Sequence, residues 1–514
     1  AVGAMQDFFD TAESSMKMDA QWQEMVSRFR SSGARAEVSP LLHAELRDYQ
    51  YEGFAWMLRL ARWGVGACLA DDMGLGKTVQ TIAVLLELCR EGPALIVAPT
   101  SVCSNWENEL SRFAPTLRVC RFQDAASRTN RADLVNRLGA GDVLVTSYGL
   151  LHTESSCLSS REWRMAVFDE AQALKNADTR RARAGRRIRA GFRLVLTGTP
   201  IENYLEDLWS LFNIINPGLL GTRQSFQKRF SCLNRVSADT EEGSAERNAA
   251  RQALKALIRP FILRRTKSEV LMELPPRTEQ IIRVDMPDDE RAFYEALRRK
   301  ALDVLERTKC EKNAEEEGKR KLTILTELTR LRRACCHPAL IDPETSLPGA
   351  KLTTFMELVE ELGRGGHRAL VFSQFVGHLA QVRRTLDEAG IRYQYLDGST
   401  PERERRRSVE AFQGGEGLLF LISLKAGGQG LNLTAADYVI HLDPWWNPAV
   451  EDQASDRAYR LGQKRPVTIY RLVVRDSVEE RILALHRSKR ALAADFLEGA
   501  SVPLSEEELL ALFR

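Results

Sequence analysis

A short segment after an apolar run carries the residue types that hold phosphate groups. It reads CLADDMGLGKT from Cys68 to Thr78, and a helical pattern, TVQTIAVLLELC, follows it and stops at a Gly-Pro pair. Glycines let backbone N–H groups close on phosphate oxygens, and the helix start adds a positive dipole. Lys77 would then reach the β- and γ-phosphates, and Thr78 could ligate magnesium. The segment predicts binding of ATP or GTP.

One position departs from the general phosphate-binding pattern G-x-x-x-x-G-K-[ST]. The pattern has glycine where this chain has Asp71. Taken alone, the segment could therefore be a glycine-rich turn that connects a strand to a helix. The remaining motifs have to decide between these two interpretations.

A pair of acids follows a second apolar run. Asp169 and Glu170 end the sequence MAVFDE and precede Ala171 and Gln172. A carboxylate at the carboxyl edge of a parallel sheet could hold magnesium opposite the phosphates, which is the role expected for Asp169. Glu170 could then accept a proton from the attacking water, which gives hydrolysis. The alternative is two solvated acids at the start of a helix.

A further run ends in a turn of small hydroxyl residues, Thr197-Gly198-Thr199, before Pro200. These side chains could sense the state of the nucleotide and relay it to another site. A turn of this kind is by itself more often structural. We therefore assign it a coupling role only together with the other motifs.

Apolar runs bounded by turn residues must supply the strands that position these groups. They form two clusters, one between Gly64 and Pro200 and one between Ala369 and Val474. Runs of this length separated by helix-length segments are typical of buried parallel strands. The runs are GVGACLA, ALIVAP, DVLVTSY, MAVFDE and RLVLTGTP, then ALVFSQF, YQYLDGST, LLFLIS, YVIHLD and VTIYRLVV. Two α/β lobes are expected.

The segment between the clusters, about 201–349, is polar and has helical patterning. Its charge-rich stretches, 237–247 and 309–321, indicate exposed loops or frayed helix ends. Near the start of the chain Trp22, Met25, Val26 and Phe29 have helical spacing and predict an apolar stripe.

The composition restricts the class of protein. Of the 514 residues 44% are apolar, and 73 basic and 70 acidic residues give a net charge of +3, which neither favours nor opposes a nucleic-acid partner. No run approaches the ~18 apolar residues of a membrane span, so a cytosolic location is expected. The nine cysteines are scattered, and the adjacent Cys335 and Cys336 suit neither a C-x-x-C zinc site nor a disulfide framework. We interpret them as reduced thiols.

Taken together, the motifs occur in the order found in superfamily-two helicases. The phosphate-binding segment, the DEAQ acids and the TGT turn stand with LRDYQ, LIVAPTSVCSNW, SLKAGGQGLNL, DPWWNPAVEDQ and DRAYRLGQ. From about Leu46 to Leu483 the chain resembles a SWI/SNF-type ATPase. Its compact length and its DPWWNPAVEDQ segment look similar to microbial members of that family. That family also has aspartate at the position of Asp71. The resemblance implies an α/β fold of two RecA-like parallel-sheet lobes with helical insertions and a C-terminal helical brace.

The resemblance also implies a domain organisation. The expected parts are an N-terminal helical segment (1–40), lobe 1 with a helical insertion after about 201 (41–265), a helical linker (266–348), lobe 2 (349–490) and a helical tail (491–514).

The resemblance assigns roles to individual residues of the ATP site. Gln50 matches the glutamine that reads adenine, and the phosphate loop is Asp71, Asp72, Met73, Gly74, Leu75, Gly76, Lys77 and Thr78. Asp169 matches the magnesium ligand and Glu170 the base. Arg457 and Arg460 match the paired arginines that face the γ-phosphate when the lobes close, and R-x-x-R spacing on a helix would put both on one face.

DNA contacts and coupling are implied in the same way. The positions matching family DNA contacts are Thr100, Ser147, Gln374, Ser423 and Lys425, whose side chains suit phosphates and do not read sequence. Trp446 could contact DNA or pack in the core, with packing favoured. Gln172 stands where many relatives have histidine, and His337 is expected to be structural. The arginine-rich stretch 180–193 is either a solvated helix or a patch for DNA or a partner.

The function implied is an ATP- and Mg²⁺-dependent translocase on double-stranded DNA, monomeric, that remodels protein–DNA complexes. It would be nucleoid-associated in a prokaryote and nuclear in a eukaryote. A strand-separating DNA or RNA helicase is an alternative, although no wedge element is evident. A DNA clamp with little turnover is another, which the presence of Lys77, Glu170, Arg457 and Arg460 disfavours.

Overall fold

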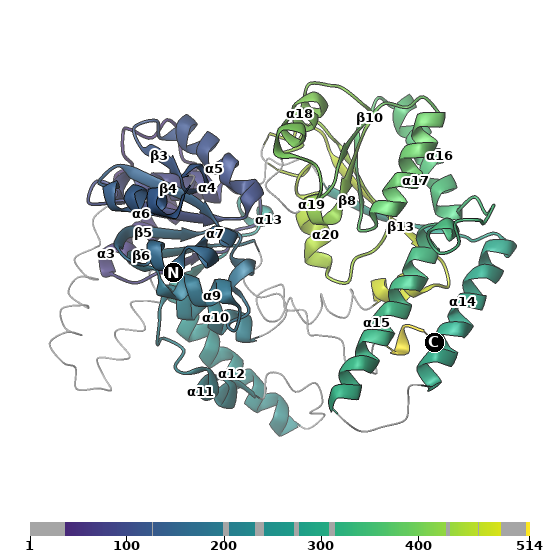
Figure 1. The fold of residues 1–514 in the computed structure, drawn as a ribbon, viewed down its shortest axis with the longest axis horizontal. Helices are drawn as coiled ribbons and strands as arrows, with labels where there is room; N and C mark the ends of the chain where they lie inside the picture. Colours follow the sequence, from purple (N-terminus) through teal and green to yellow (C-terminus); the bar gives the residue numbers. More distant parts are fainter. Residues whose placement is uncertain are drawn as a thin grey trace. The chain divides into compact units, whose positions relative to one another are not determined.

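The chain forms two compact units, Ala1–Met272 and Glu273–Arg514 (Figure 1). A computed structural model describes residues 36–125, 127–198, 205–231, 241–271, 277–307, 314–427, 432–460, 462–484 and 510–513. The apolar stripe predicted around Trp22 and most of the C-terminal tail lie outside these ranges. Each unit contains its own parallel sheet, which confirms the predicted fold class.

The first unit is built on a seven-stranded sheet in the order β3-β4-β2-β5-β6-β1-β7, with parallel pairing throughout. The central strands are almost wholly buried, as their continuous apolar runs require. The strands are β1 Ala67–Leu69, β2 Ala94–Ala98, β3 Arg118–Arg121, β4 Asp142–Ser147, β5 Glu162–Phe168, β6 Arg189–Leu196 and β7 Ile262–Leu263.

Helices connect these strands and cover the sheet. The predicted helix after the phosphate-binding segment is present as α4, Lys77–Leu88, and packs against both α3 and α5. The other helices are α3 Asp48–Trp63, α5 Thr100–Phe113, α6 Arg128–Arg137, α7 Tyr148–Thr153, α8 Ser155–Leu158, α9 Arg180–Arg187, α10 Leu205–Ile215, α11 Arg223–Phe230, α12 Glu241–Ile258 and α13 Lys267–Val270.

The second unit has a six-stranded sheet in the order β10-β11-β9-β12-β13-β8, again parallel. Its strands are β8 Arg277–Val284, β9 Ala369–Ser373, β10 Tyr393–Leu396, β11 Leu419–Ser423, β12 Tyr438–His441 and β13 Val467–Val474. Its helices are α14 Asp288–Arg307, α15 Ala314–Cys336, α16 Ala350–Arg364, α17 Val376–Glu388, α18 Glu402–Gln413, α19 Leu424–Gly427 and α20 Pro448–Ser455.

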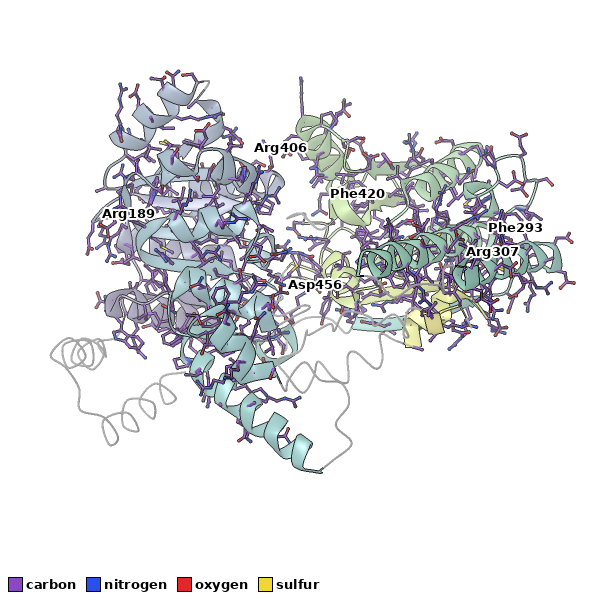
Figure 2. All side chains as sticks on the ribbon, turned by 60° about the horizontal axis from the view of Figure 1, so that its bottom comes forward. Arg189, Phe293, Arg307, Arg406, Phe420 and Asp456 are labelled. Carbon is purple, nitrogen blue, oxygen red and sulfur yellow. The ribbon has the colours of Figure 1, made fainter. Side chains whose placement is uncertain are left out.

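Separate apolar clusters support the two faces of this second sheet. One cluster includes Phe355 and Val371, and the other includes Phe412 and Phe420, so alternate strand residues point to opposite sides. Phe420 on β11 is fully buried, whereas Arg406 on α18 is exposed (Figure 2).

Helices α14 and α15 run side by side and form a third cluster at the end of the second unit (Figure 1). The described part of the C-terminal tail packs here. Leu512 and Phe513 are buried in the cluster, and Arg298 Nε donates to the carbonyl of Phe513 at 2.7 Å. The tail therefore contacts the α14–α15 pair through its last residues.

The middle segment, predicted as polar and helical with exposed loops, also contains two strands that were not expected. β7 and β8 lie at the edges of their sheets, and β8 pairs along its full length with β13. The sequence of β8, RTEQIIRV, is half polar because much of the strand is exposed. The arginine-rich stretch 180–193 is also only partly helical, because α9 ends at Arg187 and β6 begins at Arg189.

No helix in the described ranges is long and apolar enough to cross a membrane. The cysteines of those ranges are free thiols, as expected.

Candidate functional site

The carboxyl edge of the first sheet brings the predicted ATP-site motifs together. Strands β5, β6 and β1 lie next to one another in the sheet. The DEAQ acids follow β5, the TGT turn follows β6, and the phosphate-binding loop follows β1. The Thr197 N–H donates to the Leu69 carbonyl at 3.2 Å, and the Asp169 N–H to the Val97 carbonyl at 2.8 Å. Motifs that are distant in sequence thus share one edge, where open parallel sheets bind ligands.

The phosphate-binding loop has the backbone conformation that its glycines permit. Gly74 and Gly76 have φ angles of 87° and 79°, in the left-handed region that other residues rarely adopt. Gly76 is also the residue that precedes α4. Lys77 Nζ donates to the carbonyls of Asp71 at 2.6 Å and Asp72 at 3.3 Å. The lysine is thereby held at the helix start, where phosphate groups bind.

The structure gives Asp71 a structural reason for departing from glycine. Its side chain is fully buried, and Arg265 donates to it through Nε at 3.0 Å and through Nη2 at 2.6 Å. Gln80 on α4 donates to the same carboxylate at 3.3 Å. Since Arg265 follows β7, this bidentate pair joins the loop to the edge strand. Arg265 was not among the predicted site residues, and it stands in the short sequence Ile262-Leu263-Arg264-Arg265.

Gln50 and Tyr49 hold the loop from α3. Gln50 Nε2 and the Tyr49 hydroxyl each donate to the carbonyl of Leu75 at 3.1 Å. A Cβ atom at Gly76 would lie 2.4 Å from Gln50 Nε2, so only glycine allows this close approach. Gln50, expected to read adenine, therefore lies directly against the phosphate-binding loop.

Asp169 has the surroundings of a metal-binding carboxylate. Its Oδ2 accepts from the indole Nε1 of Trp106 at 2.8 Å, and its Oδ1 accepts from the Glu170 backbone at 2.8 Å. Burial raises the pKa of Asp169, while the Trp106 hydrogen bond and the charge of Lys77 oppose that rise. Carboxylate and hydroxyl oxygens are the ligands that Mg²⁺ prefers. The Asp169 carboxylate and the Thr78 hydroxyl supply oxygen donors of that kind.

Glu170 lies in an unusual backbone conformation for a residue with a side chain. Its φ of 47° and ψ of 54° are left-handed, at a typical cost of about 1–2 kcal/mol. The Tyr148 hydroxyl donates to the neighbouring Asp169 carbonyl at 2.7 Å, which helps to fix the turn. Strain of this kind concentrates where a side chain must be aimed for function. Gln172 follows in a short 3-10 helix, Ala171–Leu174, and is half-buried.

The predicted coupling turn packs against the phosphate-binding loop. Thr197 is buried, and a Cβ atom at Gly198 would lie 3.1 Å from Met73 Cγ. The third residue of the turn, Thr199, lies outside the described residues. The Met73 side chain therefore lies close to the Gly198 backbone, so the two loops are neighbours.

The predicted DNA contacts of the first unit differ in exposure. Thr100 is exposed at the start of α5. Ser147 is buried, and its hydroxyl accepts from the Leu150 N–H at 3.3 Å as the cap of α7. In the arginine-rich helix α9 four arginines are exposed, Arg180, Arg181, Arg183 and Arg187, which agrees with a solvated face and is also compatible with a patch.

The predicted contacts of the second unit cluster near its own strand ends. Gln374 follows β9 and is half-buried, and Ser423 ends β11 in register with Ser373. The side chain of Lys425 is outside the description. Trp446 is half-buried and packs against the α14–α15 cluster, with the Arg332 guanidinium 4.8 Å from its ring.

The structure corrects the helical placement of the two predicted arginines. Helix α20 ends at Ser455, and Arg457 and Arg460 lie in the tight turns that follow. There the backbone hydrogen bonds span three residues instead of the four of an α-helix. The Arg457 N–H, for example, donates to the Ala454 carbonyl at 3.2 Å. Arg457 is buried and Arg460 is half-buried, so the two do not share an exposed helix face.

Comparison with known protein families identifies both halves of this arrangement. Residues 49–340 match the SNF2-related domain, and residues 350–462 match the helicase conserved C-terminal domain. The chain belongs to the SNF2 family of helicase-like ATPases.

Individual relatives of this SNF2 chain come from bacteria, archaea and animals. It is 40% identical over 491 residues to YwqA of Bacillus subtilis, named as a candidate ATP-dependent helicase/translocase, covering 93% of this chain and 52% of YwqA. It is 36% identical over 526 residues to the human SWI/SNF-related matrix-associated actin-dependent regulator of chromatin subfamily A member 1, covering 96% and 48%. The SWI2/SNF2 ATPase core of Sulfolobus solfataricus in complex with dsDNA is 35% identical, with 93% and 98% covered and a TM-score of 0.45. The chain spans about half the length of the curated relatives.

Proposed function

We propose that this chain is a DNA-dependent ATPase that converts ATP hydrolysis into movement along double-stranded DNA and so remodels protein–DNA complexes. The observation that carries the proposal is the meeting of a glycine-formed phosphate loop, Lys77, Asp169 and Glu170 at one sheet edge. Membership of the SNF2 family supports the same activity, as does the helicase/translocase name of the Bacillus relative.

The residues of the first unit would divide the chemistry of hydrolysis among them. Backbone N–H groups of the loop and the α4 start would bind the phosphates, and Lys77 would neutralise charge on the β- and γ-phosphates. Asp169 and Thr78 would hold Mg²⁺, which bridges the phosphates and neutralises developing charge. Glu170, beside Asp169, would take the proton of the attacking water.

The second unit would complete the ATPase and contribute to DNA binding. We propose that Arg457 and Arg460 stabilise charge in the transition state.

Residues of both units would bind DNA. The side chains that would contact DNA phosphates are Thr100, Gln374, Ser423 and Lys425. Ser147 would donate its hydroxyl proton while its oxygen caps α7. Met73 against Gly198 offers the path from nucleotide to the TGT turn.

The experiment is steady-state ATP turnover with no nucleic acid, single-stranded DNA, duplex DNA and RNA, each at one salt concentration because phosphate contacts are salt-dependent. We expect strong stimulation by duplex DNA alone. Lys77→Ala serves as the inactive control in every arm.

Movement is measured separately by displacement of a third strand from a duplex, which reports translocation and does not need the two duplex strands to separate, and strand separation is measured in parallel on a forked duplex. Duplex-stimulated turnover with third-strand displacement supports the proposal. Stimulation by single strands or RNA with strand separation would establish a helicase instead, and DNA binding with ATP but no turnover would establish a clamp.

A further inference from the structure

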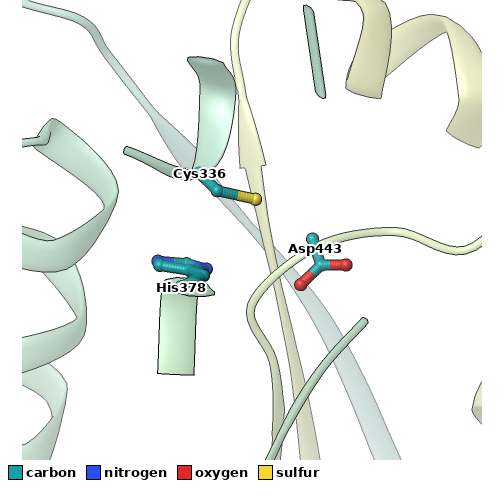
Figure 3. A group of neighbouring side chains, drawn as sticks. All are labelled: Cys336, His378 and Asp443. Carbon is teal, nitrogen blue, oxygen red and sulfur yellow. The ribbon is translucent and has the colours of Figure 1, made fainter. Parts of the chain in front are cut away.

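A buried group of possible metal ligands lies in the second unit, separate from the residues assigned to ATP and DNA. Cys336 ends α15, His378 lies in the first turn of α17, and Asp443 follows β12. Figure 3 shows the three side chains converging from these segments. The Cys336 sulfur, one ring nitrogen of His378 and one carboxylate oxygen of Asp443 all lie within 4.8 Å of one another. All three residues are buried.

The state of His378 points to a ligand at this position. Its side chain is fully buried, and neither Nδ1 nor Nε2 has a hydrogen-bond partner. Burial of such a polar ring without partners is costly, and native proteins rarely leave both nitrogens unsatisfied.

Two other buried histidines of the same unit provide a comparison. The Nδ1 of His337 accepts from the Ala339 N–H at 3.1 Å, where it caps the 3-10 helix Pro338–Leu340, which agrees with its expected structural role. The Nε2 of His441 lies 2.9 Å from the Ser455 hydroxyl. His378 differs from both in facing a thiol and a carboxylate with no such partner.

The carboxylate of the group is already oriented. Asp443 accepts from the Ser373 hydroxyl, and its two oxygens accept from the Gln374 backbone N–H at 3.3 and 3.1 Å. Hydrogen bonds that fix a carboxylate in this way are the usual support of a metal ligand. Oδ1 accepts from both Ser373 and Gln374, whereas Oδ2 accepts from Gln374 alone and keeps a lone pair for a cation.

The surrounding charges permit a divalent cation. Nearby Lys351 is neutralised by Glu479, whose two oxygens are each 2.7 Å from Nζ. Arg332 is held by the Pro444 carbonyl and the Trp446 ring, although its positive charge still acts on Asp443. A dication bound by one thiolate and one carboxylate would be neutral overall.

We propose that Cys336, His378 and Asp443 bind a Zn²⁺ ion. The mixture of sulfur, nitrogen and oxygen donors suits zinc and disfavours Mg²⁺ or Ca²⁺, which prefer oxygen alone. In a tetrahedral zinc site the ligand atoms are roughly 3.3–3.6 Å apart. Side-chain rotations that move the three ligand atoms by about 1 Å would therefore bring them to zinc-binding distance. The ion would tie the ends of α15 and β12 to the start of α17, directly behind Gln374.

The first test measures zinc content of the full chain by mass spectrometry after incubation with Zn²⁺ and removal of excess, with affinity from competition against a chromophoric chelator. We expect one zinc ion per chain. Co²⁺ in place of zinc should produce a thiolate-to-metal absorption band in the near ultraviolet.

Paired variants locate the ion. Cys336→Ser and His378→Gln should each weaken zinc binding by more than about tenfold. Loss of a residue that only supports a metal ligand typically lowers affinity by about that factor, and loss of the ligand itself should cost at least as much. Cys335→Ser and His441→Gln are the matched controls, because Cys335 is the adjacent buried thiol facing Ser477 and His441 is satisfied by Ser455. Both controls should bind zinc as the wild type does.

Two results would overturn the proposal. One is a wild-type chain that takes up no stoichiometric zinc, which requires no variant to fold. The other is equal zinc content in the wild type, Cys336→Ser and His378→Gln. Neither result depends on whether the chain hydrolyses ATP.

Discussion

At the scale of single residues, Glu170 has a backbone conformation that is costly for a residue with a side chain. Among the described residues, Glu170 and Asp476 are the non-glycine residues with positive φ, and Glu170 alone of these follows the predicted magnesium ligand. A side chain kept in a strained turn beside Asp169 is best explained by a need for its carboxylate.

We therefore expect Glu170→Gln to bind ATP and DNA while turnover falls by at least about 100-fold, the range typical of a lost general base. Glutamine keeps the shape but cannot accept the proton. Turnover and nucleotide affinity are measured on the same preparation, with Glu162→Gln on the exposed start of β5 as the control. Normal turnover in Glu170→Gln would remove this residue as the base.

Asp71 offers a prediction that opposes the general sequence pattern. Asp71→Gly would restore the glycine of that pattern, yet it would leave Arg265, which is 10% exposed, without its carboxylate. Breaking a buried pair typically costs about 3–5 kcal/mol. We expect a lower free energy of unfolding for the first unit, measured in denaturant, and weaker ATP binding.

The control for this variant is Arg264→Met, which changes the neighbouring half-buried arginine and should have a smaller effect. If Asp71→Gly were as stable as the wild type and bound ATP equally well, the pair with Arg265 would not be what holds the loop.

At the scale of elements, what the sequence could predict depended on burial. Every apolar run assigned to a strand became one of the inner strands or β10, because strands covered on both faces need continuous apolar sequence. The strands that were missed, β3, β7 and β8, are all at sheet edges. β3 reads RVCR and its end residues are exposed, so it gives no apolar signal.

The candidate site was predictable for a related reason and with a related limit. Lys77, Asp169 and Glu170 stand in local motifs that end strands, so the sheet topology was enough to bring them together. Arg265 and Trp106 reach the same site from distant segments through hydrogen bonds of their side chains, which no local motif encodes. The grouping of Cys336, His378 and Asp443 likewise depends on three-dimensional packing and leaves no spacing pattern in the sequence.

Ion pairs add to the backbone pairing that holds the edge strand β8 against β13. Their stabilisation should depend on pH. Glu279 on β8 pairs with Arg471 of β13 at 2.6 Å and with Arg277. Burial alone would raise the pKa of Glu279, but the charges of Arg471 and Arg277 lower it to about 2. Because the pKa is lowered on folding, the stabilisation is present above the unfolded-state value of about 4.3 and is lost as pH falls towards 2.

We expect Glu279→Gln to destabilise the second unit by roughly 1–3 kcal/mol at pH 7, a value reduced for the partial exposure of the carboxylate. The difference from the wild type should shrink between about pH 4.3 and 2. Chemical unfolding at several pH values measures it, and Glu480→Gln, whose partner Arg283 is 45% exposed, is the weakly affected control. A difference that did not change with pH would indicate lost packing instead of lost charge.

At the scale of the whole molecule, the two units divide the proposed ATPase between them. The phosphate loop and both acids belong to the first unit, whereas Arg457 and Arg460 belong to the second. If the first unit provides the binding groups, nucleotide affinity should depend little on the second. Hydrolysis should depend on both.

Arg460→Ala tests this division, because Arg460 is half-buried while Arg457 is buried and its loss would also disturb packing. We expect ATP affinity within about twofold of the wild type and turnover reduced by roughly 100-fold or more, as for loss of a group that stabilises transition-state charge. Equilibrium binding of a fluorescent nucleotide and duplex-stimulated turnover are measured together. Arg465→Ala, a change at a 63% exposed arginine nearby, should leave both unchanged. Loss of ATP binding in Arg460→Ala would show that the arginine acts in the ground state, and the proposed division of roles would then be wrong.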